Sequence, residues 1–400
     1  MPARPILVIN SGSSSLKFGI YIEKNGGEEE PLIRGIADGI GRSVGKLELK
    51  DDQGRVLQSK DKRFRTQVEA FDQARQSLAE QGHIKPAAIA HRVVHGGPRL
   101  TKHQLITTDV IRELRACVHF APLHIPASLE LIEKAASCYA GVPEFACFDT
   151  AFHTTMPEVA ARFPLPSDLW DEGIRRYGFH GLSYESAVYQ LGRELASRTI
   201  IAHLGNGSSV VAIRDGRSVD TSMGLTPTGG IPMATRTGDL DPGVLLYLQR
   251  ARKMDTDSLE RLLNRESGLT AFSGGMSDMR DLEAAADKGN QPAKLAIAAF
   301  CIAIRKTVAA YAAVLGGLDM FVFTGGIGEH SARIRSNVCE GLSFLGVSLD
   351  KTRNAAHERS ISSPDSGVTV RVVTADEDRQ IARHCRTMWG SSIADSISRG

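Results

Sequence analysis

The sequence lacks most of the signatures that assign common functions to a chain of this length. It contains no G-x-x-x-x-G-K-[ST] segment, which excludes a Walker-type phosphate loop. Gly39-Ile40-Gly41 begins a G-x-G pattern that does not continue, so a dinucleotide fingerprint is not supported. No G-x-S-x-G segment appears, which excludes the nucleophile elbow of the α/β-hydrolases.

The sequence also has few cysteines, and none of them form a C-x-x-C pair. This spacing argues against a zinc site or a disulfide framework and fits a reducing cytoplasm. Each cysteine is expected to be a small core residue rather than a ligand. The six are Cys117, Cys138, Cys147, Cys301, Cys339 and Cys385.

An excess of charge of one sign is absent too, since the formal net charge is +2. Nothing therefore points to nucleic acid or to an acidic membrane surface as a partner. No apolar run is expected to be long enough to cross a bilayer, which takes about 20 residues. The opening MPARPILVIN lacks the long apolar region of a signal peptide. These features together predict a cytoplasmic protein.

Two similar turns organise what is present. Thr199 to Asp215 reads as two β-branched strands joined by a turn from Gly205 to Ser209. Ile6 to Tyr21 repeats the pattern around the turn Asn10-Ser11-Gly12-Ser13-Ser14-Ser15. Backbone N–H groups in such turns can point at an anion. The repetition predicts a duplicated architecture that holds a phosphate-bearing ligand, with two unrelated hairpins as the alternative.

Three other segments stand out. Leu318 to Thr324 predicts a buried strand that runs into a glycine-rich turn, Gly325 to His330, where a phosphate or ribose could rest. Asp220 to Gly243 is long and without periodicity, which favours a fixed functional loop. Ala293 to Leu315 predicts a long apolar helix that is buried on more than one face or packs against a partner subunit.

Charged residues in unusual settings are the candidate catalytic groups. Arg92 lies inside an apolar strand and Arg236 lies in the long loop. A buried arginine needs an anionic partner, and here a ligand is favoured over an ion pair because both adjoin glycine-rich or flexible backbone. Asp149 follows a short strand and Glu377 opens the closing helix, with helix capping as the alternative for each. His180 follows an aromatic-glycine turn, and this pattern is as compatible with a structural role as with a catalytic one. His91, His95, His119 and His153 are expected to be structural.

This combination suits phosphoryl transfer. The transferred group carries spread negative charge, so catalysis consists mainly of positioning and of stabilisation by arginine and Mg²⁺. Carboxylates at strand ends can hold Mg²⁺ directly or through water.

Eight motifs then carry a resemblance to the acetate kinase family. They occur in order along nearly the whole chain: Asn10 to Lys17, His91 to Gly97, Phe148 to His153, Arg176 to Gly181, His203 to Gly207, Asp220 to Pro227, Thr235 to Gly243 and Phe323 to Glu329. The resemblance implies an α/β fold, the duplicated ribonuclease H-like fold of actin and the sugar kinases, with two lobes of mixed sheets flanked by helices. It implies an N-terminal lobe over residues 1–150, completed by a C-terminal helix over about 380–400. A nucleotide-binding lobe would span residues 151–380.

The resemblance also implies roles for single residues. Asn10 and Glu377 would place Mg²⁺ (or Mn²⁺), and Arg92 would bind the substrate carboxylate. Asp149 would be an essential acid, and His180 and Arg236 would stabilise the transferring phosphoryl group. The residues that would contact ATP or ADP are Lys17, His203, Leu204, Gly205, Asn206, Gly207, Asp278, Met279, Arg280, Gly326, Ile327, Gly328, Glu329 and His330. Those that would receive the substrate's methyl group are Val94, Leu123, Phe179 and Pro227.

The implied reaction is the reversible, direct in-line transfer of the γ-phosphoryl group of ATP to acetate, giving acetyl phosphate and ADP, in a homodimer. A carboxylic acid is already ionised at neutral pH, so no general base is needed, and Asp149 is better assigned to Mg²⁺ or water positioning. A propionate or butyrate kinase would differ only in pocket volume. A sugar kinase would need a carboxylate base, and a chaperone-like or filament-forming ATPase would turn over ATP without a small carboxylate.

Overall fold

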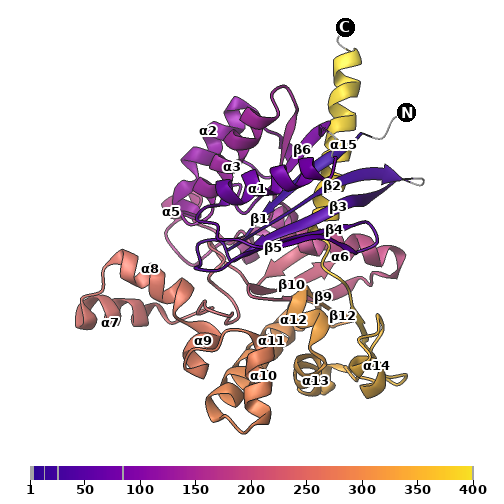
Figure 1. The fold of residues 1–400 in the computed structure, drawn as a ribbon. Coiled ribbons are helices and arrows are strands. Elements are labelled where there is room, and N and C mark those ends of the chain that lie inside the picture. Colours follow the sequence, from indigo (N-terminus) through magenta and orange to yellow (C-terminus); the bar gives the residue numbers. More distant parts are fainter. Residues whose placement is uncertain (1–3, 13, 25–26, 83–84, 399–400) are drawn as a thin grey trace. The chain divides into compact units, whose positions relative to one another are not determined.

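The structure is a computed structural model that describes residues 4–12, 14–24, 27–82 and 85–398 (Figure 1). Ser13 of the first predicted turn lies outside the described residues. The chain divides into two compact units. Unit 1 combines Met1–Ala151 with Asp376–Gly400, and unit 2 is Phe152–Ala375.

Unit 1 is built on an eight-stranded sheet with the order β5-β4-β3-β2-β1-β6-β8-β7. The first five strands form an antiparallel meander, whereas β6 and β8 run parallel to β1. The strands are β1 (Ile6–Ser11), β2 (Ser15–Lys24), β3 (Glu28–Asp38), β4 (Lys46–Asp51), β5 (Val56–Asp61), β6 (Ala88–Val93), β7 (Gln104–Leu105) and β8 (Glu144–Phe148).

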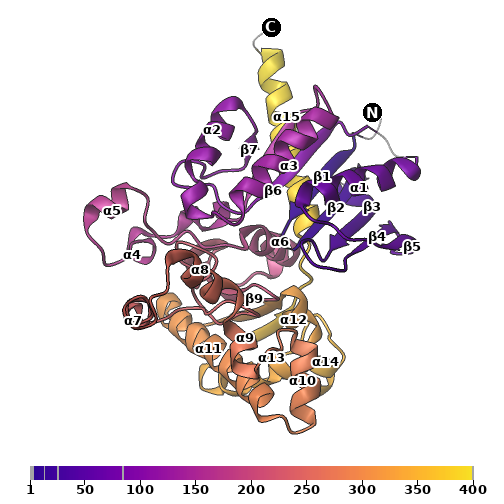
Figure 2. The same ribbon diagram turned by 60° about the vertical axis from the view of Figure 1, so that its left-hand side comes forward.

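Helices cover both faces of this sheet. Helix α1 (Gln67–Glu80) begins at Thr66, whose side chain accepts from the Glu69 N–H, and buries residues at helical spacing. It packs with α3 (Ile125–Cys138) on the face that carries Leu7 and Ile9. Helix α2 (Thr108–Ala116) packs on α3. Helix α15 (Glu377–Ser398) lies against β1 and β6 on the other face, drawn in yellow in Figure 2.

Strand pairing places three polar side chains on the face covered by α15. In the parallel pairs, Val8 lies opposite Ala90, and Arg92 lies opposite Cys147. Because side chains alternate along a strand, Asn10 follows Val8 and Asp149 follows Cys147 on the same face. Asn10, Arg92 and Asp149 therefore stand together where three neighbouring strands end, which is where ligands bind in α/β sheets.

Unit 2 repeats the arrangement with a five-stranded sheet in the order β11-β10-β9-β12-β13. Its antiparallel pairs are β9–β10 and β10–β11, and its parallel pairs are β9–β12 and β12–β13. The strands β3-β2-β1-β6-β8 of unit 1 have the same order and the same sequence of antiparallel and parallel pairs. The two predicted hairpins and the duplicated α/β fold are confirmed. The strands are β9 (Arg198–Leu204), β10 (Ser208–Arg214), β11 (Arg217–Thr221), β12 (Met320–Thr324) and β13 (Thr369–Val372).

In unit 2, α11 covers β9 and β10, and α6 and α12 also contact β9. The helices of this unit are α4 (Glu158–Ala161), α5 (Ser167–Asp171), α6 (Gly181–Leu191), α7 (Pro242–Arg252), α8 (Thr256–Arg265), α9 (Gly268–Ser273), α10 (Met279–Asp287), α11 (Gln291–Leu315), α12 (Gly325–His330), α13 (Ala332–Glu340) and α14 (Lys351–Ala355).

Helix α11 corrects two expectations. By length and composition it could cross a membrane, so the prediction that no apolar run is long enough was wrong. This is weak support for a membrane span, because a core helix passes the same test. Its buried side chains, such as Phe300, Ile304 and Val308, recur at three- and four-residue steps within the core of unit 2. They form one face, so burial on more than one face was wrong, and the alternative of packing against a partner subunit stays a prediction. Leu295, Ile302 and Val314 on the rest of the helix surface are exposed.

The two loop predictions had different outcomes. Between Thr221 and Pro242 the chain contains no helix or strand, as predicted for most of the Asp220–Gly243 segment. The glycine-rich segment after β12 is not a turn, because residues 325–330 form α12. Gly325 permits this with φ +78, and a Cβ there would lie 2.7 Å from the Leu204 carbonyl oxygen.

Candidate active site

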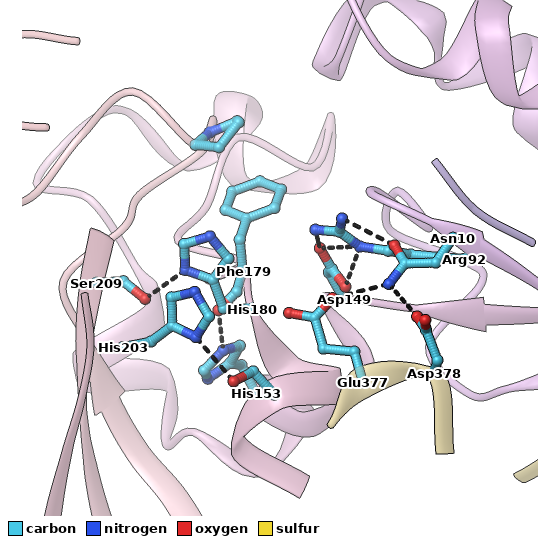
Figure 3. Close-up of polar contacts among 12 residues, drawn as sticks. Asn10, Arg92, Asp149, His153, Phe179, His180, His203, Ser209, Glu377 and Asp378 are labelled. Carbon is cyan, nitrogen blue, oxygen red and sulfur yellow. Dashed lines mark hydrogen bonds and ion pairs between the residues drawn. The ribbon is translucent and has the colours of Figure 1, made fainter. Parts of the chain in front are cut away.

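The polar cluster of unit 1 centres on an ion pair between Arg92 and Asp149 (Figure 3). The Arg92 Nε donates to Asp149 Oδ1 and Oδ2 at 3.0 and 3.1 Å, and Nη2 donates to Oδ2 at 2.5 Å. Asp149 is 1 % exposed. The expectation that disfavoured an ion pair for Arg92 was wrong, because the register of β6 and β8 brings the two charges together.

Asn10 connects this pair to the start of α15. Its Oδ1 accepts from Arg92 Nη1 at 3.2 Å, and its Nδ2 donates to Glu377 Oε2 at 3.1 Å and to Asp378 Oδ1 at 2.6 Å. The residue before the helix, Asp376, accepts from the Arg379 N–H. Capping therefore falls to Asp376, and Glu377 is directed to the cluster.

The cluster carries more negative than positive charge. Burial alone would lower the pKa of Arg92, yet the carboxylates of Asp149 and Glu377 raise it above its ordinary value. Burial raises the pKa of Asp378, and the charges of Glu377 and Asp376 raise it further, although Lys17 and Asn10 act in the opposite direction. Carboxylate and amide oxygens are the donors that Mg²⁺ prefers, so this set of side chains fits a divalent cation.

The polar cluster of unit 2 starts at the turn before α6. His180 has φ 58 and ψ 22, a left-handed conformation that costs a non-glycine residue of order 1–3 kcal/mol. His153 supports the turn, since its Nε2 lies 3.0 Å from the Phe179 carbonyl oxygen and its Nδ1 2.9 Å from Ser218 Oγ. Burial lowers the pKa of His153 to about 4, so it is neutral and structural, donating to Phe179 and accepting from Ser218.

His180 is oriented by the strands beside it. Its Nδ1 lies 2.8 Å from Ser209 Oγ on β10, and its ring stacks on that of His203 with centroids 4.3 Å apart. His203 Nδ1 is in turn 2.8 Å from Ser183 Oγ at the start of α6. Figure 3 shows the two imidazoles side by side, with Ser209 next to His180.

Arg236 is fixed within the long loop by backbone contacts. Its carbonyl oxygen accepts from the Met233 N–H at 3.0 Å, and its Nη1 donates to the Pro227 carbonyl oxygen at 3.1 Å. Gly268, with φ +65, permits the close approach of α9, because a Cβ there would lie 2.5 Å from the Arg236 carbonyl oxygen.

His180 and Arg236 converge at the turn between β9 and β10. A Cβ built on Gly207 would lie 3.2 Å from His180 Nε2 and 3.7 Å from Arg236 Nη1. Two nitrogen atoms therefore border the space that a side chain at residue 207 would enter. With the backbone N–H groups of a glycine turn nearby, this arrangement suits the oxygens of a phosphoryl group.

Replacing Gly207 by alanine is therefore expected to lower kcat by about 10- to 100-fold, because displacing a preorganised donor by a few tenths of an ångström weakens transition-state stabilisation. Steady-state kinetics and thermal unfolding check this. The matched control is Gly224→Ala in the same unit, whose Cβ would approach only the Phe163 ring, at 3.4 and 4.0 Å. An equal loss of kcat in both variants would contradict a specific role for the space at Gly207.

The segments predicted to contact a nucleotide lie on three elements of unit 2. The turn from Leu204 to Gly207 adjoins α12, where Gly325 meets the Leu204 backbone. Helix α10 begins at Asp278, which accepts from the Arg280 N–H, and the exposed Arg280 side chain pairs with the same carboxylate at 2.6 Å. The Ser331 Oγ, at the end of α12, donates to Glu283 of α10.

The remaining predicted residues occupy varied settings. Glu329 Oε1 accepts from the Ala375 N–H at 2.9 Å, so this oxygen supports the backbone just before α15. Lys17 is exposed on β2. Of the four proposed methyl-pocket residues, Val94 and Leu123 belong to unit 1, and Phe179 and Pro227 to unit 2. Val94 and Phe179 are buried, whereas Leu123 is 42 % exposed.

Sequence reasoning missed three residues that contact these groups. Ser209 bonds His180, Tyr184 bonds Ser209, and Asp378 shares Asn10 with Glu377. The strand alternation around the second glycine turn could have placed Ser209 on one face with His203, since the two lie opposite each other in the β9–β10 pair.

The two α/β units share one strand order, and their arginine–carboxylate cluster and histidine–arginine pair are the groups that suit a phosphotransferase. The family model that describes the acetokinase family matches residues 5–383. The chain belongs to the acetokinase family.

Individual relatives agree with this assignment. The chain is 42 % identical over 399 residues to the acetate kinase of Nitrobacter hamburgensis, and the match covers 98 % of each. The chain is 36 % identical to the Porphyromonas gingivalis acetate kinase seen in a crystal structure, with a TM-score of 0.85. The match covers 96 % of this chain and 99 % of that one. A propionate kinase from Francisella tularensis is 37 % identical with a TM-score of 0.88, over 96 % of this chain and 99 % of that one.

Proposed function

We propose that this protein transfers the γ-phosphoryl group of ATP to acetate, reversibly, giving acetyl phosphate and ADP. The observation that carries the proposal is the hydrogen bonding of Asp149, the carboxylate expected to be essential. Both of its oxygens accept hydrogen bonds from Arg92. A hydroxyl kinase needs a carboxylate that accepts a proton, whereas an acid substrate is ionised at neutral pH and needs only cationic support.

In this proposal, different side chains bind the substrate carboxylate and stabilise the phosphoryl group. Arg92, oriented by Asp149 and Asn10, binds the substrate carboxylate and lowers the cost of bringing it toward an anionic phosphate. His180 Nε2 and Arg236 Nη1 contact oxygens of the transferring phosphoryl group, where negative charge is spread in the transition state. The Pro227 carbonyl oxygen keeps the Arg236 guanidinium in place. Because no proton is abstracted, positioning and charge account for the rate.

The metal belongs to the unit 1 cluster in this proposal. Glu377, Asp378 and Asn10 would hold Mg²⁺, or Mn²⁺, either directly or through water, and Asp149 would orient that water. When bound, the ion would neutralise charge on the nucleotide phosphates. Lys17, whose charge acts on Asp378, would add to that neutralisation.

Nucleotide contacts in this proposal come from unit 2. The backbone of the turn from His203 to Gly207, the residues Gly326 to His330 of α12, and Asp278 to Arg280 at the start of α10 would surround ATP. The methyl group of acetate would meet Val94, Leu123, Phe179 and Pro227.

The test is to incubate the protein with Mg-ATP and hydroxylamine, separately with acetate, propionate, butyrate and glycerol. Acyl hydroxamate and ADP are measured together. Hydroxamate formed with acetate at least as fast as with the longer acids is the expected result. ADP formed without hydroxamate would refute carboxylate phosphorylation and point to a hydroxyl kinase or a bare ATPase.

Propionate is the second candidate substrate, favoured by the similarity to the Francisella tularensis propionate kinase. One methylene in a pocket changes the free energy by only about 1–3 kcal/mol. Faster hydroxamate formation with propionate than with acetate would select this alternative without changing the proposed mechanism.

A homodimer is the proposed assembly. Helix α7 contains no buried residue, and several of its large apolar side chains are exposed. The exposed fractions are 40 % for Val244, 48 % for Leu246 and 60 % for Tyr247, with Leu240 just before the helix at 45 %. Several large apolar side chains exposed on one helix are typical of an interface, and a second copy of the chain is the proposed partner.

Introducing glutamate at Leu246 and Tyr247 together is expected to convert the dimer to a monomer, because two buried charges at an interface would be unpaired. Light scattering after gel filtration would then give the chain mass of 43.2 kDa instead of twice that value. Val159→Glu, at a side chain 89 % exposed in the same unit, is the control and should leave the mass unchanged. A double variant that keeps the wild-type mass would rule out α7 as the interface.

The proposed setting is the cytoplasm. All six cysteines are free thiols, and five of them are buried. Burial raises the pKa of Cys117 and Cys301 to about 11, so these thiols stay protonated and unreactive at neutral pH.

A further inference from the structure

A buried tyrosine hydroxyl lies behind His180. Tyr184 is on α6, one turn after His180, and is 0 % exposed. Its ring packs near those of Phe152 and His153, with centroids 6.1 and 5.7 Å away. Its hydroxyl forms a hydrogen bond with Ser209 Oγ, the same atom that lies 2.8 Å from His180 Nδ1. Tyr184, Ser209 and His180 therefore form one continuous chain of hydrogen bonds.

The chain has a direction. The Tyr184 hydroxyl is buried, and burial raises its pKa, so it keeps its proton at neutral pH. A buried O–H needs an acceptor, and the acceptor within hydrogen-bond distance is Ser209 Oγ, so the Tyr184 proton goes to Ser209. The Ser209 proton then goes to His180 Nδ1, which acts as an acceptor. In a neutral imidazole with Nδ1 as acceptor, the ring proton is on Nε2.

The other ring nitrogen faces the turn. His180 Nε2 is the atom closest to a Cβ at Gly207, with Arg236 Nη1 next to it. A donor at Nε2 would attract an anionic oxygen there, whereas a lone pair would repel it. We propose that Tyr184 and Ser209 are positioning residues that hold His180 in its Nε2–H tautomer, so that this histidine donates to the phosphoryl group. This inference rests on the role proposed for His180.

The first measurement is of the unliganded protein. Long-range ¹H–¹⁵N correlation spectra of histidine-labelled protein distinguish protonated from unprotonated ring nitrogens, and His180→Gln identifies the His180 signals by their loss. The wild type is expected to show a protonated Nε2 and an unprotonated Nδ1. A wild-type His180 with its proton on Nδ1 overturns the proposal, whatever any variant does.

The second measurement uses Tyr184→Phe, which keeps the buried ring and removes the hydroxyl. The expected results are a mixed tautomer signal and a fall in kcat of about 10-fold, the size of one hydrogen bond, with KM for acetate and ATP nearly unchanged. Ser209→Ala should lower kcat at least as much, and the double variant no further than Ser209→Ala, because the residues act through one chain.

The matched control is Tyr177→Phe. Tyr177 is also buried in unit 2, and its hydroxyl donates to the Gly173 carbonyl oxygen at 2.8 Å. This variant loses a buried tyrosine hydrogen bond that does not involve Ser209, so its His180 tautomer should match the wild type. A Tyr184→Phe protein with the wild-type His180 tautomer and the wild-type kcat refutes the proposal. A Tyr177→Phe protein in which the tautomer and kcat change as much as in Tyr184→Phe also refutes it.

Failure of this inference and failure of the proposed function are distinguishable. The tautomer is read without substrate, whereas the function is read by hydroxamate formation in the wild type. Hydroxamate formation by a protein whose His180 carries its proton on Nδ1 refutes only the positioning role of Tyr184 and Ser209. The correct tautomer without hydroxamate supports the hydrogen-bond chain and refutes the acetate reaction.

Discussion

Arg236→Ala is expected to lower kcat by about 10³-fold or more, the range found when an arginine that stabilises a transferring phosphoryl group is removed. The guanidinium Nη1 lies beside Gly207 and His180, and its Cα is fixed by the loop. KM for acetate should change much less than kcat, because the interaction strengthens in the transition state. Steady-state kinetics in both directions measure both constants.

Arg236→Lys should recover little of this activity. A lysine is a point charge on a flexible stem and lacks the planar fork that contacts two oxygens. The control is Arg217→Ala, which removes the same charge from an exposed position on β11 of the same unit. If Arg217→Ala lost as much kcat, or if Arg236→Ala retained a tenth of the wild-type value, Arg236 would not be catalytic.

Arg92→Leu is expected to have the second large effect, and it should act on stability as well as on activity. Asp149 would keep its charge in a site that is 1 % exposed, with its guanidinium partner gone. Breaking a buried ion pair on one side typically costs about 3–5 kcal/mol. Urea unfolding should therefore shift to lower concentration, and hydroxamate formation should become undetectable.

The double variant Arg92→Leu/Asp149→Leu separates the two effects. Replacing both members of a buried pair by apolar residues is often close to neutral for folding, so the unfolding midpoint should return toward the wild type. Activity should stay absent, because the cation for the substrate carboxylate is still missing. A double variant that regains hydroxamate formation would show that the Arg92 charge serves only the fold.

Much of the fold could be predicted because its signals are local. Strand composition and glycine-serine turns identified both hairpins, and the duplicated order of the sheets bears this out. Helix α11 was found from its apolar pattern, but the buried face depends on neighbours distant in sequence. The segment of residues 325–330 was read as a turn because of its glycines, but it forms helix α12, which contacts β9.

The site was harder to predict than the fold. Family motifs located Arg92 and Asp149 but not their contact, which joins residues 57 apart through the parallel register of β6 and β8. Tyr184 gave no signal of its own, since an aromatic residue in a helix is ordinary, and Ser209 could have been placed only through the alternation of side chains along β10. Their role depends on side-chain direction across β10 and α6, which spacing along the chain does not fix.

The way the chain returns to unit 1 through α15 has a consequence for biosynthesis. The ribosome makes β1, β6 and β8 early, yet the helix that covers their second face emerges only after all of Phe152–Ala375. Unit 2, whose core lies within one continuous segment, can fold while the sheet of unit 1 still exposes apolar surface. The same late helix delivers Glu377 and Asp378 to Asn10. A nascent chain therefore gains the carboxylates of this cluster in the step that buries the sheet, and incomplete chains carry neither.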